Sequence, residues 1–174
     1  MGVCLQPPAT SSPLDGVVAR CEELDAVFWK WQSADGAMCK ARFGGKTGRN
    51  PTDRGKPGTK RSVLVDEHGG PLAVVIAGAN GPDTKLLDAM LAAIVIDRPD
   101  PNEHEQHLCL DKGDDNSTGT AAVKKHQYVP HIRRIGEESK ARKHKKSKPR
   151  RWVVERTLGW LPKCRALLVR DDKN

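Results

Sequence analysis

Three carboxylate residues, Asp35, Asp111 and Glu155, stand where a folded chain can bring acidic side chains to one point. Asp35 ends a strand-like run in which side chains alternate between two faces. Asp111 directly follows the short apolar run Leu108–Leu110, and Glu155 lies in the helical-looking segment 150–156, whose other charges are all positive. Carboxylate oxygens are the ligands that hard divalent cations take, and a pair of such ions neutralises a phosphodiester. If the three side chains converge, they predict a nuclease or transposase site.

Each carboxylate also has an ordinary structural explanation. Asp35 precedes Gly36 and could be a turn residue, and Asp111 could cap the loop that follows it. Glu155 could form a surface ion pair with Arg151, because residues four apart on a helix are neighbours. Apolar residues around Glu155 place it at the edge of a buried helical stripe, from which it can face a sheet. The chain has 22 acidic residues, so the three carboxylates alone are not specific.

The sequence around these residues is more specific than the carboxylates themselves. Four ordered motifs resemble the catalytic region of bacterial insertion-sequence transposases of the DDE type, most closely the insertion-sequence five family; they are residues 34–41, 46–56, 110–113 and 151–157. The resemblance runs from about Leu24 to Lys173. It implies a ribonuclease H-like fold with Asp35, Asp111 and Glu155 as the catalytic, metal-binding triad. It also implies two Mg²⁺ ions, with Mn²⁺ as a substitute.

The same resemblance implies a function. Such a protein cuts DNA at the ends of an insertion sequence and transfers the freed 3′-hydroxyl into target DNA. Its partners would be the terminal inverted repeats and the target DNA, on which it would act as a homo-oligomer in the bacterial cytoplasm, at the nucleoid. The alternative, from a different class, is a catalytically inactive, truncated remnant that only binds DNA non-specifically.

Several positions depart from the family's pattern. Asp114 stands where the family usually has an aromatic residue, so it adds a negative charge close to Asp111. Asp171 also stands where an aromatic residue is common. Pro162 interrupts what the family continues as a helix, at a cost of about 3 kcal/mol if the helix ran on. We expect the chain to lack the helical region that precedes the family's catalytic core and an apolar helix that follows it, as in a second-frame product or a decayed copy.

Charge is unevenly distributed along the chain. The net charge of +8 divides into 12 basic and 15 acidic residues in 1–111, against 18 basic and 7 acidic residues in 112–174. The second part favours a polyanionic partner. The basic segment 140–151 stands just before Glu155, so we expect it to hold DNA phosphate, although a merely solvated segment has the same composition. The residues predicted to bind DNA are Lys112, Lys143, Lys145, Lys146, Lys148, Arg150, Arg151 and Arg156.

Other kinds of site have little support. No stretch approaches 18 apolar residues, so no membrane span is predicted. Residues 44–47 resemble the end of a phosphate-binding loop, but position 40 is a lysine and no strand leads into the loop, so we expect no nucleotide. Five cysteines without paired spacing indicate reduced, structural thiols. His104 and His107 match no zinc spacing and are expected on a solvated loop.

The pattern of apolar residues predicts the elements that must position the triad. We expect a helix from Asp15 to Phe28, then the strand that reaches Asp35, then a long exposed loop at 44–60. The later elements are a hairpin over 62–65 and 72–77, helices over 83–94 and 118–125, strands over 107–110 and 128–132, and the helix that carries Glu155. This β-β-β-α-β-α-β-α order predicts an α/β fold with a ribonuclease H-like mixed sheet and flanking helices. Residues 1–31 are assigned to a lead-in with its packing helix, and residues 32–174 to the catalytic domain.

Overall fold

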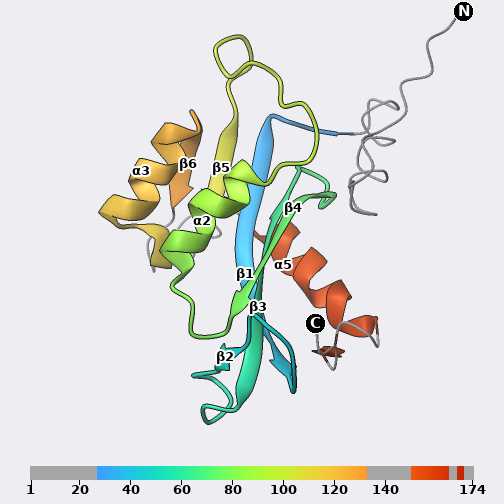
Figure 1. The fold of residues 1–174 in the computed structure, drawn as a ribbon. Helices are drawn as coiled ribbons and strands as arrows, with labels where there is room; N and C mark the ends of the chain where they lie inside the picture. Colours follow the sequence, from blue (N-terminus) through green and yellow to red (C-terminus); the bar gives the residue numbers. More distant parts are fainter. Residues whose placement is uncertain (1–26, 133–149, 165–167, 171–174) are drawn as a thin grey trace, which may run out of the picture.

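The computed structural model describes residues 27–132, 150–164 and 168–170, which form one mixed sheet with helices on both faces (Figure 1). Three long strands come first in the chain, and two shorter ones follow. The five longest of the sheet's seven strands are β1 (Trp31–Ala41), β3 (Pro57–Val65), β4 (Pro71–Gly78), β5 (His107–Leu110) and β6 (Val129–Ile132). None of the helices within these ranges is long and apolar enough to cross a membrane.

Across the sheet, the main strands follow the order β4, β3, β1, β5, β6. The first three pair antiparallel, and β5 and β6 continue parallel to β1. A parallel pair needs a crossover, which is supplied by α2 (Asp83–Ala92) before β5 and by α3 (Ser117–Lys125) before β6. This order of strands and helices confirms the predicted ribonuclease H-like mixed sheet.

The loop expected over 44–60 is only partly a loop. Gly48–Arg49 form the short strand β2, which pairs with the start of β3 at Pro57 and Gly58. Between the two strands, the Asn50 carbonyl accepts the Gly55 N–H at 2.9 Å and closes a turn. The prediction was wrong because the Gly, Pro and polar residues that indicate a loop here build the turn of a hairpin.

The helix α2 begins without a side-chain cap. Pro82 is the N-cap residue, and no side chain accepts a hydrogen bond from the first turn. The Asp83 carboxylate instead accepts a bond from the Lys60 ammonium at 2.7 Å. The next helix, α3, has a side-chain cap, because the Asn116 side chain accepts the Gly119 N–H at 2.9 Å.

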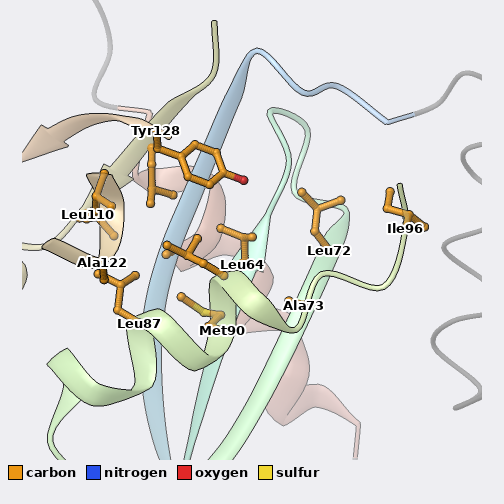
Figure 2. Packing of buried hydrophobic residues seen from close by; sticks show 13 residues of the cluster. Leu64, Leu72, Ala73, Leu87, Met90, Ile96, Leu110, Ala122 and Tyr128 are labelled. Carbon is orange, nitrogen blue, oxygen red and sulfur yellow. The ribbon is translucent and has the colours of Figure 1, made fainter. Parts of the chain in front are cut away.

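The two faces of the sheet carry apolar clusters of different size. On one face, α2 and α3 cover a large cluster that includes Leu64, Leu87 and Ala122 (Figure 2). On the other face, α5 (Trp152–Trp160) covers a smaller one. The buried members of that second cluster are Val63, Val65, Val153, Val154 and Leu158. Each fully buried aliphatic side chain contributes about 1.5–3 kcal/mol, so most of the apolar stabilisation lies on the α2 and α3 face.

The chain after α5 contains two short elements. A 3₁₀ helix over Leu161–Lys163 includes Pro162, which agrees with the prediction that this proline ends the helix. Val169–Arg170 form β7, a strand that the sequence did not predict, and it pairs parallel with the end of β1. The helix expected from Asp15, most of the basic segment 140–151, and Asp171 lie outside the described residues.

Candidate active site

Asp35 lies in the middle of β1 rather than at its end, because the strand continues to Ala41. Gly36, which suggested a turn, instead pairs with Ser62 of β3. The Asp35 Oδ1 atom accepts the Gly36 N–H at 2.7 Å. Burial raises the pKa of the Asp35 carboxyl above its ordinary value, and the negative charges of Asp111 and Glu155 add to that rise. Asp35 is therefore held close to other carboxylates in a partly desolvated place.

Asp111 comes directly after β5, as the sequence predicted. The parallel register pairs Ser33 with Cys109, so Asp35 and Asp111 each come two residues after a paired position. Asp111 is also the N-cap residue of a 3₁₀ helix over Lys112–Asp114, and its Oδ1 atom accepts the Lys112 N–H at 2.7 Å. The parallel pairing of β1 with β5 thus brings Asp111 beside Asp35, and the bond from the Lys112 N–H orients the Asp111 carboxylate.

Glu155 is carried by α5, which is held against the hairpin turn between β3 and β4. The Thr157 hydroxyl donates to the Gly69 carbonyl at 2.9 Å, and the Arg156 guanidinium donates to the His68 carbonyl. Gly69 has φ +93°, and a Cβ atom there would come within 2.9 Å of both Arg156 and Thr157. A glycine is therefore required for the close approach that sets the position of Glu155.

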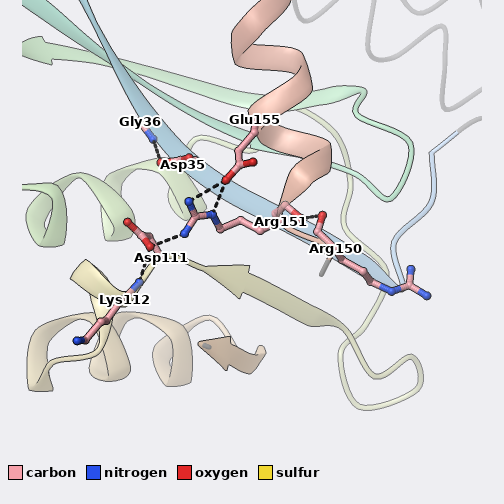
Figure 3. A network of polar contacts seen from close by, with 8 residues as sticks. Asp35, Gly36, Asp111, Lys112, Arg150, Arg151 and Glu155 are labelled. Carbon is pink, nitrogen blue, oxygen red and sulfur yellow. Dashed lines mark hydrogen bonds and ion pairs between the residues drawn. The ribbon is translucent and has the colours of Figure 1, made fainter. Parts of the chain in front are cut away.

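Arg151 connects the acidic residues (Figure 3). Its guanidinium donates to Glu155 Oε1 from Nε at 3.0 Å and from Nη2 at 2.8 Å. The same guanidinium donates from Nη1 to Asp111 Oδ1. The ion pair with Glu155 was foreseen at the helical i, i+4 spacing, whereas the contact with Asp111 was not. Arg151 thus joins Asp111 to Glu155, and its positive charge also opposes the rise in the pKa of Asp35.

The donor set fits a hard divalent cation in its chemistry. All three side chains offer carboxylate oxygens, which Mg²⁺ and Mn²⁺ take as ligands, and a cationic group already lies among them. In this structure Asp111 and Glu155 bind the Arg151 guanidinium instead of a metal ion. Within the described ranges, no three His, Cys, Asp or Glu side chains are grouped closely enough to hold a metal. By their chemistry, Asp35, Asp111 and Glu155 could hold such an ion in place of the Arg151 guanidinium.

A cavity of about 180 Å³ opens beside the triad, between β1, β3 and α2, and extends to Asp114. Burial raises the pKa of Asp114 to about 6, and the charges of Asp83, Asp111 and Asp35 add to the rise. Lys60 also lines this cavity, with its ammonium 3.0 Å from the Gly81 carbonyl and 2.7 Å from Asp83. Sequence reasoning missed Lys60, because nothing in its neighbourhood distinguishes a buried lysine from a loop lysine.

The residues predicted to bind DNA are only partly described. Lys112 is exposed beside Asp111, and Arg150 lies over the Trp31 ring at 4.4 Å while its guanidinium pairs with Glu67. Arg156 lies between two indole rings on one face of α5, 4.7 Å from the Trp152 ring and 5.1 Å from the Trp160 ring. Lys143, Lys145, Lys146 and Lys148 lie outside the described residues.

The exposed indoles of α5 were missed by the sequence reasoning. Trp152 is 45% exposed and Trp160 52% exposed, and with Arg156 they follow each other at intervals of four residues. That spacing was available in the sequence and marks one face of a helix. For His107, the predicted strand over 107–110 is confirmed and the predicted solvated loop is wrong: it is the first residue of β5, and its ring stacks on Trp31 with centroids 4.2 Å apart.

Comparison with known proteins gives the family. Residues 23–170 match the family model described as Transposase DDE domain. A protein of Burkholderia cepacia, provisionally named as the transposase for insertion sequence element IS402, is 35% identical over 133 residues, which cover 74% of this chain and 60% of the relative. The chain thus spans about 60% of the length of that curated relative.

Solved structures of Mos1 transposase superpose only loosely on this chain. The Mos1 catalytic domain with raltegravir and Mn has 10% identity and a TM-score of 0.41, with 86% of each chain covered. A pre-cleavage Mos1 transpososome has 10% identity and a TM-score of 0.43, with 99% of this chain and 60% of that chain covered. The fold assignment rests on strand order and the family assignment on the sequence matches. By the family match, which spans most of its length, the chain belongs to the family described as Transposase DDE domain.

Proposed function

We propose that this chain is the catalytic domain of a transposase that cuts DNA at the ends of an insertion sequence and joins the freed end to target DNA. The observation that carries the proposal is the convergence of Asp35, Asp111 and Glu155, from β1, the end of β5 and α5, around one cationic group. The family match supports the same class of reaction. Membership of the insertion-sequence five family stays a prediction.

Asp35, Asp111 and Glu155 are proposed as the ligands of two Mg²⁺ ions, for which Mn²⁺ can substitute. Bound ions of this kind lower the pKa of water and neutralise charge on a phosphodiester. The protein's own contribution is placement, since each carboxylate comes from a separate element that is fixed by backbone hydrogen bonds or by the docking of α5. The side chains form no covalent bond to DNA in this scheme.

DNA is the proposed partner, as terminal inverted repeats and as target, with a homo-oligomer assembled on it. Exposed Lys112 and the basic segment 140–151 supply positive charge in the same part of the sequence that carries Glu155. Phosphate contacts position a duplex without specifying its sequence, so we expect this chain to bind DNA with little sequence preference. The indole and guanidinium faces of Trp152, Arg156 and Trp160 are suited to stack against unpaired bases. We expect the protein in the bacterial cytoplasm, at the nucleoid.

A second candidate function is a catalytically inactive remnant that only binds DNA. One observation favours it: Asp114 places a further carboxylate in the cavity beside Asp35 and Asp111. Its charge opposes the approach of a phosphodiester, although protonation relieves that repulsion as the pH falls below about 6. In this case the chain would keep its affinity for DNA and lose cleavage.

Cleavage of a terminal-repeat duplex distinguishes these two functions. The transposase, expressed in full from its insertion sequence, should cut the duplex with Mg²⁺ or Mn²⁺ and not with Ca²⁺. Asp35→Asn, Asp111→Asn and Glu155→Gln should each lower the rate by at least about a hundredfold, since they remove a proposed metal ligand. Asp88→Asn is a matched control, because Asp88 lies on α2 and pairs with Lys125 at 2.9 Å. Rates within a few-fold of the parent for all three triad variants would refute the assignment.

A further inference from the structure

The guanidinium of Arg151 uses the same oxygens that a metal ion would need. It bonds to Oδ1 of Asp111 and, through two nitrogens, to Oε1 of Glu155 (Figure 3). Burial raises the pKa of Asp35, and the positive charge of Arg151 opposes that rise. One arginine therefore interacts with all three carboxylates of the proposed triad.

The helix α5 fixes where this arginine stands. Arg151 is the N-cap residue, and the Glu155 N–H donates to the Arg151 carbonyl, so the two residues lie one helical turn apart on the same side. Asp111 Oδ1 already accepts the Lys112 N–H at 2.7 Å in addition to the Arg151 bond. Asp111 Oδ1 and Glu155 Oε1 thus both accept bonds from the Arg151 guanidinium, and a metal ion bound to these two oxygens would take the place of the guanidinium.

We propose that Arg151 is a resident counter-ion of the acidic site, which a divalent metal ion must displace in order to bind. This proposal rests on the proposed function, because it takes Asp35, Asp111 and Glu155 as the metal ligands. Before the exchange, the guanidinium offsets the repulsion between carboxylates. After it, the guanidinium is released beside the site, where its five N–H donors suit a DNA phosphate. Metal loading and the availability of Arg151 for DNA are therefore coupled.

The exposure of the ion pairs makes such an exchange reversible. The Arg151 side chain is 29% exposed, and its partners Asp111 and Glu155 are 53% and 50% exposed. Ion pairs in contact with water contribute little net free energy each, so a dication can replace them. A fully buried pair would hold the arginine in place instead. Losing two such pairs should change metal affinity by about threefold to tenfold.

Titration of the 174-residue chain with Mn²⁺ in the absence of DNA tests the exchange. Bound Mn²⁺ is measured by the loss of the free-ion electron paramagnetic resonance signal. Arg151→Gln should bind Mn²⁺ about threefold to tenfold more tightly than the parent, because the competing cation is gone. Arg150→Gln is the matched control: it removes the same charge from the adjacent residue, whose guanidinium pairs with Glu67 instead of the triad. Arg150→Gln should change the affinity much less.

Asp111→Asn, alone and combined with Arg151→Gln, tests the metal-binding role of the triad separately from the counter-ion role of Arg151. If Asp111→Asn abolishes Mn²⁺ binding but Arg151→Gln binds no more tightly than the parent, the counter-ion role is wrong and the triad stands. If Asp111→Asn leaves the Mn²⁺ affinity of both backgrounds unchanged, the ion binds elsewhere and the triad assignment fails with it. An equal gain from Arg150→Gln would show that net charge alone sets the affinity, which would also overturn the counter-ion role.

A second measurement needs no variant. Nuclear magnetic resonance of arginine Nε–Hε groups should show the Arg151 signal shifting when Mg²⁺ is added, at the concentration that saturates the site. Arg98 is the internal reference, because its Nε donates to Gln106 Oε1 at 2.7 Å, away from the triad. An Arg151 signal that stays unchanged at saturating Mg²⁺ would contradict the exchange.

Discussion

The two faces of the sheet differ in what they bury. Under α2 and α3 lies a continuous apolar cluster that includes Leu64 and Val123, both fully buried. Under α5 there are fewer apolar contacts, and polar ones take their place, such as the Thr157 hydroxyl on the Gly69 carbonyl. The helix that brings Glu155 to the triad is thus the more weakly packed one. The face under α2 and α3 contributes most of the apolar stabilisation, whereas the face under α5 buries fewer apolar residues and positions charged groups.

A matched pair of substitutions tests this difference. Val123 on α3 and Val154 on α5 are both fully buried, so Val→Ala removes the same atoms from each face. Val123→Ala should lower the free energy of unfolding by about 2–3 kcal/mol, and Val154→Ala by about 1–2 kcal/mol, since the thinner layer can collapse into the space. Urea unfolding measures both values. DNA cleavage should show the reverse order, because only Val154→Ala loosens the helix that carries Glu155. If the two variants lost equal amounts of unfolding free energy and of cleavage rate, the two helices would be equally well packed and the difference between the faces would be refuted.

Asp114 is an exception to this division, because it places a carboxyl beside the α2 face. Its pKa is raised to about 6, so the folded protein binds this proton more tightly than the unfolded chain does. Ionisation of Asp114 therefore lowers the free energy of unfolding as the pH rises from about 4 to about 6. Asp114→Asn cannot ionise, and should stabilise the protein by about 1–2 kcal/mol at pH 7, after allowance for solvent screening, and hardly at pH 4.

Urea unfolding of Asp114→Asn at both pH values measures the effect. Asp115→Asn, in an exposed neighbour, is the control and should give little change at either pH. A gain for Asp114→Asn of the same size at pH 4 and pH 7 would show that packing, and not the charge, is responsible. No gain at pH 7 would show that the carboxyl is well solvated.

The sequence predicted the parts of the fold that depend on local pattern. Alternating apolar residues and turn residues indicated the β3–β4 hairpin, and the apolar run before Asp111 indicated β5, so the order of these strands along the chain was predicted. The position of Asp35 in mid-strand was not predictable in the same way. Ala34-Asp35-Gly36-Ala37 has the composition of a turn, and only pairing with β3 makes it a strand.

Contacts between distant residues were harder to predict than elements. Arg151 reaches Asp111 across 40 positions of sequence, and no local spacing indicates that bond. Lys60 belongs to a polar stretch, and its burial depends on Asp83 lying beside it in the folded chain. The stacking of His107 on Trp31 likewise arises only when β1 and β5 pair in parallel. Local composition indicates which elements form, whereas the charge partners of a side chain are set by how the sheet is assembled.

Asp35, Asp111 and Glu155, carried by three separate elements, are proposed to form one metal site. An anomalous difference map from crystals of the chain soaked in Mn²⁺ would locate the ion directly. We expect a Mn²⁺ peak coordinated by oxygens of all three carboxylates, with the Arg151 guanidinium turned away from Asp111 and Glu155. A Mn²⁺ peak bound only to other acidic residues, with Arg151 still joining Asp111 to Glu155, would contradict it.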